Sequence, residues 1–396
     1  MIAFFRLFRT LSAMALAVSA IAAATPGGSA DPYEITTIIP LTGGGSFLGK
    51  SQAQSLQAVE TLVNKHGGIK GRPIHFLIKD DQSSPQVAVQ LTNAALAEKP
   101  PVLLGSSISA MCNAMTAIVK TAGPTQYCFS PGIRPVKGSY TFSSSVSVFD
   151  LAIVGLRYLK SRGLDRVAII TSTDASGQDG EHAFDAAAQR PELQGLHIVE
   201  HAHFNPSDVS VSAQMAEIKA SKPDVIVAWS TGTPFGTLLR GILNAGIDVP
   251  TMGGNGNATY QQMAQYKSIL PKELLFPSPR FIAHDQVLPG PIRDAQDLFF
   301  NAFKAVGIRP DIAHSESWDP ALIFVDALRH VGTNATAEQV RAYIANLHGF
   351  TGINGIYDFR DGSQRGLTAN SAIVVRWNPK LDTWVGVSGP GGYPRK

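Results

Sequence analysis

Two kinds of hydrophobic pattern alternate along the chain. Short runs of β-branched and aromatic residues, typical of strands, alternate with longer stretches whose apolar residues recur every three or four positions, typical of amphipathic helices. In residues 50–66, for example, Leu56, Val59, Leu62 and Val63 fall on one helical face. The first part of the chain therefore predicts strands at 34–40, 74–79, 102–104 and 125–129 and helices at 50–66, 85–98 and 109–121. This alternation predicts a parallel sheet with helices on both of its faces.

The alternation pauses at residues 132–147, which are rich in Gly, Pro and Ser, and then resumes. The remaining chain predicts helices at 151–161, 181–189, 211–220, 235–245, 292–306, 320–330 and 337–347, and strands at 167–171, 197–204, 225–229, 251–253, 355–359, 372–377 and 383–387. A second pause at residues 276–279 marks another crossing of the chain. Because 396 residues are too many for one hydrophobic core, we expect two similar α/β halves joined by two or three linkers.

The first thirty residues have the pattern of an export signal. Arg6 and Arg9 precede an apolar stretch, residues 11–24, that is too short to span a bilayer. The small residues at 28–30 predict cleavage before Asp31, with cleavage after Ala24 as the rival and an uncleaved amphipathic helix as a further alternative. We therefore expect a soluble exported protein, located in the periplasm.

Charge and cysteine content limit the partners and suggest one cross-link. Loss of Arg6 and Arg9 lowers the formal net charge from +3 to +1, which does not favour a nucleic-acid or membrane-surface partner. Cys112 begins a predicted helix and Cys128 ends the next predicted strand, so both lie near the same edge of a parallel sheet. In an oxidising compartment they pair or remain two buried thiols, and the sequence leaves both alternatives open.

Small polar residues gather where predicted strands end. Five such segments are residues 43–49, 105–109, 130–134, 230–233 and 253–257. In open parallel sheets, ligands bind at the carboxyl ends of the strands, beside helix N-termini. These segments therefore predict a site that offers backbone amides and hydroxyl groups to a small polar ligand.

Catalytic and metal-binding motifs are missing from the sequence. It contains no phosphate-binding loop, no G-x-S-x-G elbow, no H-E-x-x-H and no C-x-x-C, so we expect no enzyme activity and no cofactor. His201 and His203 share one face of a predicted strand, but no third ligand is apparent, so a solvated edge is favoured over a metal site. Asp80 and Asp81 are expected to cap backbone amides at a strand end.

An ordered set of motifs resembles the leucine/isoleucine/valine-binding type of periplasmic solute-binding protein. The matching segments are Pro40-Leu-Thr-Gly43, Gly67-Gly-Ile-Lys-Gly-Arg-Pro73, Asp80-Asp-Gln-Ser-Ser-Pro85, Ser130-Pro-Gly132, Asp174-Ala-Ser-Gly-Gln178, Leu239-Arg-Gly-Ile-Leu-Asn-Ala-Gly246 and Thr351-Gly352. The resemblance implies the type I periplasmic-binding-protein fold: an α/β chain of two doubly wound parallel-sheet lobes with a hinge of crossing strands. It also implies a monomer that delivers its ligand to an ABC permease.

With this fold, the domain boundaries are expected at the two pauses. The signal occupies residues 1–30, lobe 1 comprises residues 31–147 and 280–350, and lobe 2 comprises residues 148–279 and 351–396. A ligand sensor of the same fold is an alternative function. An enzyme of the doubly wound class and a DNA-binding repressor are disfavoured, because neither catalytic motifs nor a helix-turn-helix appear.

The resemblance also implies ligand contacts, carried over position by position. They are Phe47 and Leu48 in the first glycine segment, Ser106 and Ser107 after the third strand, Gly132 and Arg134 after the fourth, Ser176, Asn255, and Trp318 in the opposite wall. Trp229 is expected to belong to the core. The family's hydroxyl position carries Arg134, its tyrosine position carries Ser176, and its ammonium-binding acid is replaced by Asn255.

These departures predict a ligand class. A buried ammonium needs a compensating anion, which Asn255 does not supply, whereas Arg134 suits a carboxylate. The hypothesis is therefore a small carboxylate-bearing ligand without an amine, such as an aromatic or short organic acid. The alternative is an amino acid: Arg134 then lies in solvent, and Glu316 or Asp179 binds the ammonium.

Overall fold

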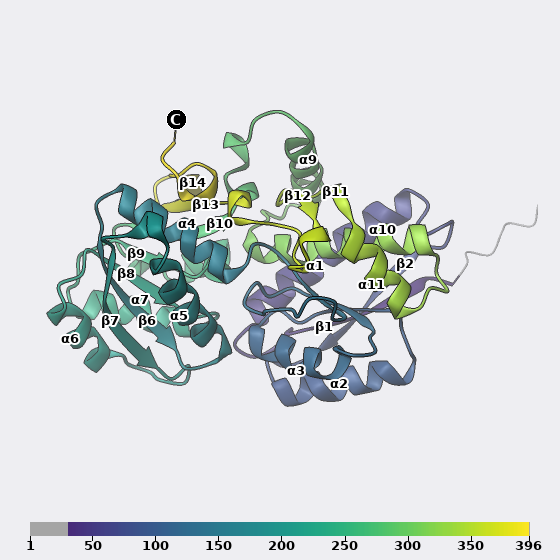
Figure 1. Cartoon of the computed structure of the whole chain (residues 1–396), viewed down its shortest axis with the longest axis horizontal. Helices are drawn as coiled ribbons and strands as arrows, with labels where there is room; N and C mark the ends of the chain where they lie inside the picture. Colours follow the sequence, from purple (N-terminus) through teal and green to yellow (C-terminus); the bar gives the residue numbers. More distant parts are fainter. Residues whose placement is uncertain (1–30, 396) are drawn as a thin grey trace, which may run out of the picture.

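The computed structural model describes residues 31–395, and the expected export signal, residues 1–30, lies outside them. The chain forms two α/β lobes side by side (Figure 1). Within residues 31–395, no helix is long and apolar enough to cross a membrane. The two-lobed, doubly wound arrangement confirms the predicted fold class.

Lobe 1 is built on a five-stranded parallel sheet with the strand order β2-β1-β3-β4-β5. Its strands are β1 (Tyr33–Ile39), β2 (Ile74–Asp80), β3 (Val102–Gly105), β4 (Thr125–Cys128) and β5 (Thr141–Ser143). Its helices are α1 (Ser46–Lys65), α2 (Pro85–Ala97), α3 (Ser109–Val119), α9 (Pro291–Lys304), α10 (Ile312–Val331) and α11 (Ala337–Asn346). Helices α2 and α3 pack together on one face of the sheet, and α1, α10 and α11 cover the other (Figure 1).

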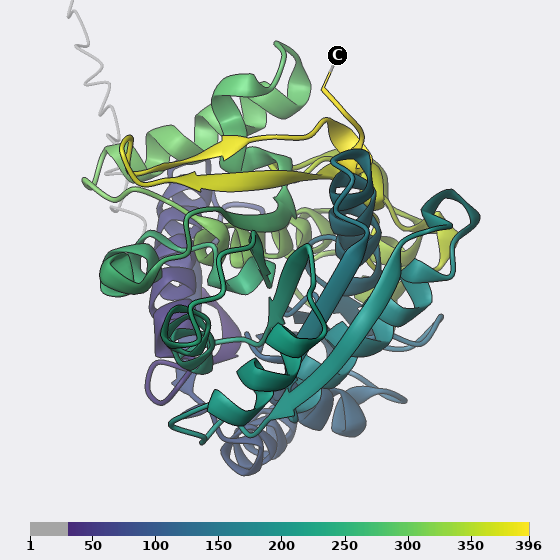
Figure 2. The same cartoon turned by 90° about the vertical axis from the view of Figure 1, so that its left-hand side faces the viewer.

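Lobe 2 is built on a seven-stranded sheet with the strand order β14-β13-β10-β9-β8-β6-β7. Its strands are β6 (Arg166–Ser172), β7 (His197–Phe204), β8 (Val225–Trp229), β9 (Thr251–Gly253), β10 (Leu274–Pro279), β13 (Ala372–Asn378) and β14 (Thr383–Gly386). Its helices are α4 (Val148–Ser161), α5 (Ala175–Ala188), α6 (Ser212–Ala220), α7 (Pro234–Asn244) and α8 (Tyr260–Gln265). The strands from β6 to β10 are parallel, and the last two, side by side in Figure 2, are antiparallel.

The chain crosses between the lobes three times, after β5, after β10 and before β13. The last crossing lies further along the chain than residue 351, where we expected it. Strand β12 (Ile356–Asp358) pairs with β11 (His348–Thr351), the Tyr357 hydroxyl donates to lobe-1 Asp319 (2.8 Å), and the Arg365 guanidinium donates to lobe-1 Ser143 (2.7 Å). These bonds attach residues 351–365 to lobe 1, so that only the chain beyond them joins lobe 2.

Several elements begin earlier than the hydrophobic pattern predicts, because capping groups set their starts. Helix α5 begins at Ala175, since the Asp174 side chain accepts from the Gly177 amide (3.0 Å). Helix α10 begins at Ile312 rather than at Pro320, since Asp311 and His314 form a capping box.

Some segments expected to be irregular contain secondary structure. Residues 43–49, expected to be a loop, contain the first turn of α1. Residues 276–279, expected to be a crossing, belong to the buried strand β10. Its two prolines lie beyond Leu274 and Leu275, the only residues that pair with β9, so they interrupt no ladder on that side.

The two cysteines are joined in a disulfide, with their Cα atoms 5.9 Å apart. Cys112 lies in the first turn of α3 and Cys128 ends β4, so the cross-link ties together two strand–helix units beside the loop at residues 130–134. Of the two alternatives that the sequence left open, the structure contains the paired one.

Candidate ligand-binding site between the lobes

A small cavity lies between the two lobes. Its lining consists of Leu48, Ser107, Ser109, Ser130, Pro131, Gly132, Val148 and Glu316 from the lobe-1 side and the first crossing, and Ser176, Trp229, Thr231, Gly254, Asn255 and Gly256 from lobe 2. Only about 20 Å³ is free to molecules of the size of water. The lobes are therefore drawn together, and a larger ligand requires them to move apart.

Hydroxyl groups form the lobe-1 wall. Ser107 and Ser109 come from the junction of β3 with α3, and Ser109 Oγ lies 3.0 Å from Ser130 Oγ. Ser130 Oγ also accepts from the Gly132 amide (3.2 Å), which holds the loop after β4 against the start of α3. This wall combines three hydroxyl groups with the N-terminus of an eleven-residue helix, a combination suited to a carboxylate.

The lobe-2 wall is partly apolar and partly polar. The Trp229 indole ends β8 and packs edge-on against Phe184 (5.2 Å between ring centroids). A Cβ at Gly180 would collide with this indole, so glycine lets α5 lie directly on it. Ser176, in the first turn of α5, lies 2.6 Å from Thr231 Oγ1. Trp229, expected in the core, is thus buried but also forms a wall of the cavity.

Asn255 carries a polar group with no partner among the described residues. The side chain is 3% exposed, and its Nδ2 donates no hydrogen bond within residues 31–395. Neighbouring Asn257 holds the loop in place, since its Nδ2 donates to the Ser230 carbonyl (2.6 Å). A buried amide donor without an acceptor costs free energy, and an acceptor on a ligand would remove that cost.

Glu316 is the charged side chain of the cavity lining. It is 1% exposed, and its Oε2 accepts from Gln52 Nε2 (3.2 Å), whose Oε1 in turn accepts from the Ser107 hydroxyl. Burial raises the pKa of Glu316 well above its usual range; the Gln52 hydrogen bond lowers it, and the charge of Asp311 raises it further. No Lys, Arg or His is among the lining residues, so a cationic ligand group has one acidic partner here, Glu316, and an anionic group has hydroxyl and amide groups as its polar donors.

Five of the nine expected contact residues line this cavity: Leu48, Ser107, Gly132, Ser176 and Asn255. The structure thus brings together residues that follow five different strands, β1, β3, β4, β6 and β9. Their binding role remains a prediction.

Four expected contact residues lie elsewhere. Phe47 packs beside the cavity with Leu48 and Ala313. The Ser106 hydroxyl donates to Asp81 (2.5 Å) instead of facing the cavity. Trp318 is buried in lobe 1, edge-on to Phe299 (5.0 Å). Its expected place in the opposite wall came from the resemblance, whereas in α10 it faces the core.

Arg134 is the most consequential correction. Its side chain is 64% exposed, and its Nε donates to Asp179 Oδ1 (2.8 Å) across the two lobes, outside the cavity lining. Burial raises the pKa of Asp179, although the charge of Arg134 lowers it. Both groups named for ligand charges, Arg134 for a carboxylate and Asp179 for an ammonium, thus pair with each other.

Other lining residues were not singled out from the sequence. Ser109, Ser130 and Thr231 belong to the polar strand-end segments, so composition marked their segments but not the individual side chains. Glu316 appeared only as an alternative. The available signal was an acidic residue inside a helix that is otherwise buried over most of its length.

Comparison with known proteins identifies the class. The sequence pattern of the periplasmic binding protein family matches residues 32–382, nearly the whole described chain. The chain belongs to this family.

Individual relatives are distant. The chain is 24% identical to a Leu/Ile/Val-binding protein homolog of Brucella melitensis, over 59% of this chain and 65% of the relative's length. In fold it is similar to a Rhodopseudomonas palustris solute-binding protein of an ABC transporter in complex with benzoate (TM-score 0.74, 18% identity, 92% of this chain, 97% of that one). It is also similar to a branched-chain amino acid transporter binding protein of Streptococcus pneumoniae in complex with isoleucine (TM-score 0.73, 17% identity, 92% and 98%).

Proposed function

We propose that this protein is an extracytoplasmic receptor that captures a small carboxylate-bearing ligand between its lobes and delivers it to an ABC permease. Family membership supports the receptor role, and the interlobe cavity supplies a place for the ligand. The three crossings provide the connection about which lobes of this kind open and close.

The ligand carboxylate is assigned to the lobe-1 wall. Ser107, Ser109 and Ser130 offer hydroxyl groups there, and α3 directs its N-terminus toward the same place. On the opposite side, Asn255 Nδ2, which has no acceptor among residues 31–395, is a donor for a further acceptor atom of the ligand. Leu48, Val148 and Trp229 supply apolar contacts for its hydrocarbon part.

The position of Glu316 now favours an amino acid over the amine-free acid. It is the single observation that carries this choice, because the argument for an amine-free ligand depended on Arg134, which pairs with Asp179 outside the cavity. An ammonium group beside Glu316 makes the buried carboxyl ionise and pair with it. An amine-free acid instead leaves Glu316 protonated, as a hydrogen-bond donor.

Calorimetry separates the two ligand classes. Titration with leucine and valine, in two buffers of different ionisation enthalpy, is expected to show binding with release of a proton from Glu316. Glu316→Gln is expected to weaken this binding by more than tenfold. Tight binding of a benzoate-type acid without proton release, unaffected by Glu316→Gln, would establish the amine-free class. Failure of all small carboxylates to bind would overturn the proposal.

Delivery to a permease is tested separately. Deletion of the gene is expected to abolish uptake of the ligand by cells. Unchanged uptake together with a lost response to the ligand would support a sensor of the same fold instead.

A further inference from the structure

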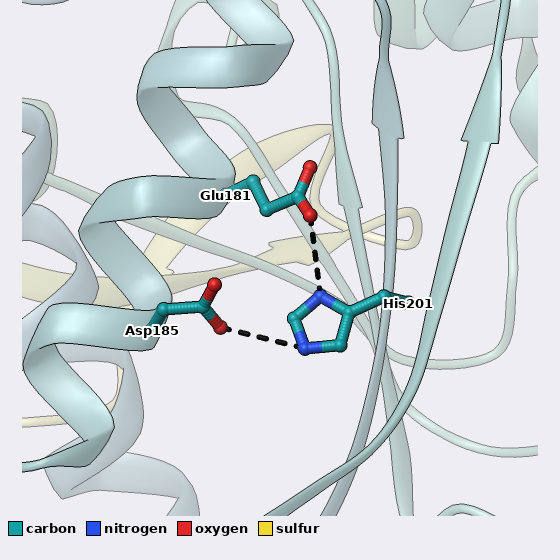
Figure 3. Close-up of side chains that lie close together, drawn as sticks. All are labelled: Glu181, Asp185 and His201. Atoms are coloured by element: carbon teal, nitrogen blue, oxygen red, sulfur yellow. Dashed lines mark ion pairs between the residues drawn. The ribbon is translucent and has the colours of Figure 1, made fainter.

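A second cluster of titratable side chains lies in lobe 2, apart from the cavity lining (Figure 3). Glu181 and Asp185 are four residues apart, so they share one face of α5. His201 and His203 are two residues apart, so they share one face of β7, the edge strand of the sheet. The two pairs meet because α5 packs against β6 and β7.

The His201 ring stands between the two carboxylates, as Figure 3 shows. Its Nδ1 lies 3.5 Å from Glu181 Oε1, and its Nε2 lies 3.4 Å from Asp185 Oδ1. Both separations exceed the roughly 2.7–3.2 Å of an N–H···O hydrogen bond. Because one imidazole gives one nitrogen to an ion, a single ion takes either Nδ1 or Nε2 of His201 together with one oxygen of each carboxylate. One ligand atom from each of the three side chains lies within 4.8 Å of the other two.

Neighbouring groups orient Glu181. His203 Nε2 lies 2.8 Å from Glu181 Oε2, and the Thr171 hydroxyl donates to the same oxygen (3.2 Å). Metal-binding carboxylates are commonly fixed by hydrogen bonds of this kind.

Charge and exposure point to the type of ion. Two carboxylates and a neutral imidazole carry a charge of −2, which a divalent cation balances. Asp185 and His201 are partly exposed, at 45% and 36%, so an ion can reach them from solvent and keep a water as its fourth ligand. A ring nitrogen among the ligands favours zinc-like ions over magnesium or calcium, which prefer oxygen alone.

We propose that Glu181, Asp185 and His201 form a binding site for a divalent transition-metal ion, with His203 as the residue that positions Glu181. The bound ion links α5 to the edge strand of lobe 2. The same helix carries Ser176 in its first turn, at the wall of the interlobe cavity, but the metal site does not depend on the ligand proposed above.

The test uses the untagged protein, stripped of metal with EDTA and titrated with Zn²⁺ alone. Calorimetry is expected to show one ion per chain with a micromolar dissociation constant, and saturating Zn²⁺ is expected to raise the melting temperature by several degrees. Co²⁺ is expected to give the visible absorption of a four-coordinate site. The absence of binding by both ions would overturn the proposal.

Variants locate the site. Asp185→Asn and His201→Ala are each expected to weaken Zn²⁺ binding by at least tenfold, and His203→Gln by less. His197→Ala is the control, because His197 is also exposed and lies on the same strand, four residues before His201. Melting curves in EDTA verify that each variant folds. Equal losses in His197→Ala and His201→Ala, or no loss in Asp185→Asn, would contradict the assignment.

Discussion

At the scale of single residues, the structure places Arg134 outside the cavity and Glu316 in its lining. Arg134 seemed suited to a ligand carboxylate but pairs with Asp179 at the surface between the lobes. Glu316 is buried in the cavity wall, where Gln52 is its hydrogen-bond partner. The ionisable group in the proposed binding site is therefore the carboxyl group of Glu316. Whether this carboxyl is protonated depends on the ligand that binds.

The raised pKa of Glu316 predicts how stability depends on pH. Because burial raises this pKa in the folded state, the folded protein holds the proton more tightly than the unfolded chain does. The stabilising effect is complete below the unfolded pKa, near 4.5, and is lost as the pH rises through the folded value. Glu316→Gln cannot ionise, so its melting temperature relative to the unsubstituted protein is expected to rise with pH.

Thermal unfolding without ligand, from pH 4 to pH 9, measures this difference. Glu338→Gln, on the exposed face of α11, is the control and is expected to show no such rise. If the melting temperature of Glu316→Gln relative to the unsubstituted protein stays constant from pH 4 to pH 9, the prediction of a raised pKa for the buried Glu316 carboxyl is wrong.

At the scale of elements, α10 shows how a proline inside a helix is accommodated. Pro320 has no N–H group, so the Glu316 carbonyl one turn earlier loses its helical donor. The Ser144 hydroxyl, from the segment that crosses between the lobes, donates to that carbonyl (2.8 Å). The same bond thus completes α10, supports the backbone of Glu316 and anchors the first crossing.

Removal of this hydroxyl is expected to destabilise the protein. Ser144→Ala leaves a buried carbonyl without a donor, which costs about 1–3 kcal/mol. Ser145→Ala is the matched control: Ser145 is adjacent and equally buried, but its hydroxyl has no partner among residues 31–395. Urea unfolding is expected to show a clear loss for the first variant and little change for the second. Equal effects would mean that the Ser144 bond contributes nothing specific.

At the scale of the whole molecule, the lobes are drawn together over the cavity, and Arg134 and Asp179 form an ion pair between them. Helices α3 and α5, from opposite lobes, are also in contact. Because Arg134 is largely exposed, its ion pair adjusts the balance between open and closed states rather than determining it.

Arg134→Ala is therefore expected to weaken ligand binding by no more than about fivefold, in line with about 0.2–1 kcal/mol for an exposed ion pair. Small-angle scattering without ligand is expected to show a slightly larger radius of gyration. Arg190→Ala, which removes an exposed ion pair within lobe 2, serves as the control. A tenfold or greater loss of affinity in Arg134→Ala would indicate direct contact with the ligand.

Local sequence was sufficient for most of the elements and for the fold class. Apolar residues recur at every second position in strands and every three or four positions in helices, and strand ends in a parallel sheet lie at the same edge, so Ser107 and Asn255 were placed near one another. Ser176 was placed there only by the resemblance to the leucine/isoleucine/valine-binding proteins. Helix starts were less predictable. They depend on hydrogen bonds of individual caps, such as those of Asp174 and Asp311, which hydrophobic periodicity does not report.

The directions of the charged side chains were decided only by tertiary structure. Whether Arg134 contacts a ligand or pairs with Asp179 depends on how the two lobes pack together. Glu316 lies at the cavity because α10 begins at Ile312, eight residues before Pro320. His201 lies close to the carboxylates of Glu181 and Asp185, which are on a helix twenty and sixteen positions earlier in the chain. The sequence by itself determined most of the strands and helices and the polar strand ends, because these follow from neighbours along the chain. The partners of each charge follow from packing between distant segments, which no local pattern encodes.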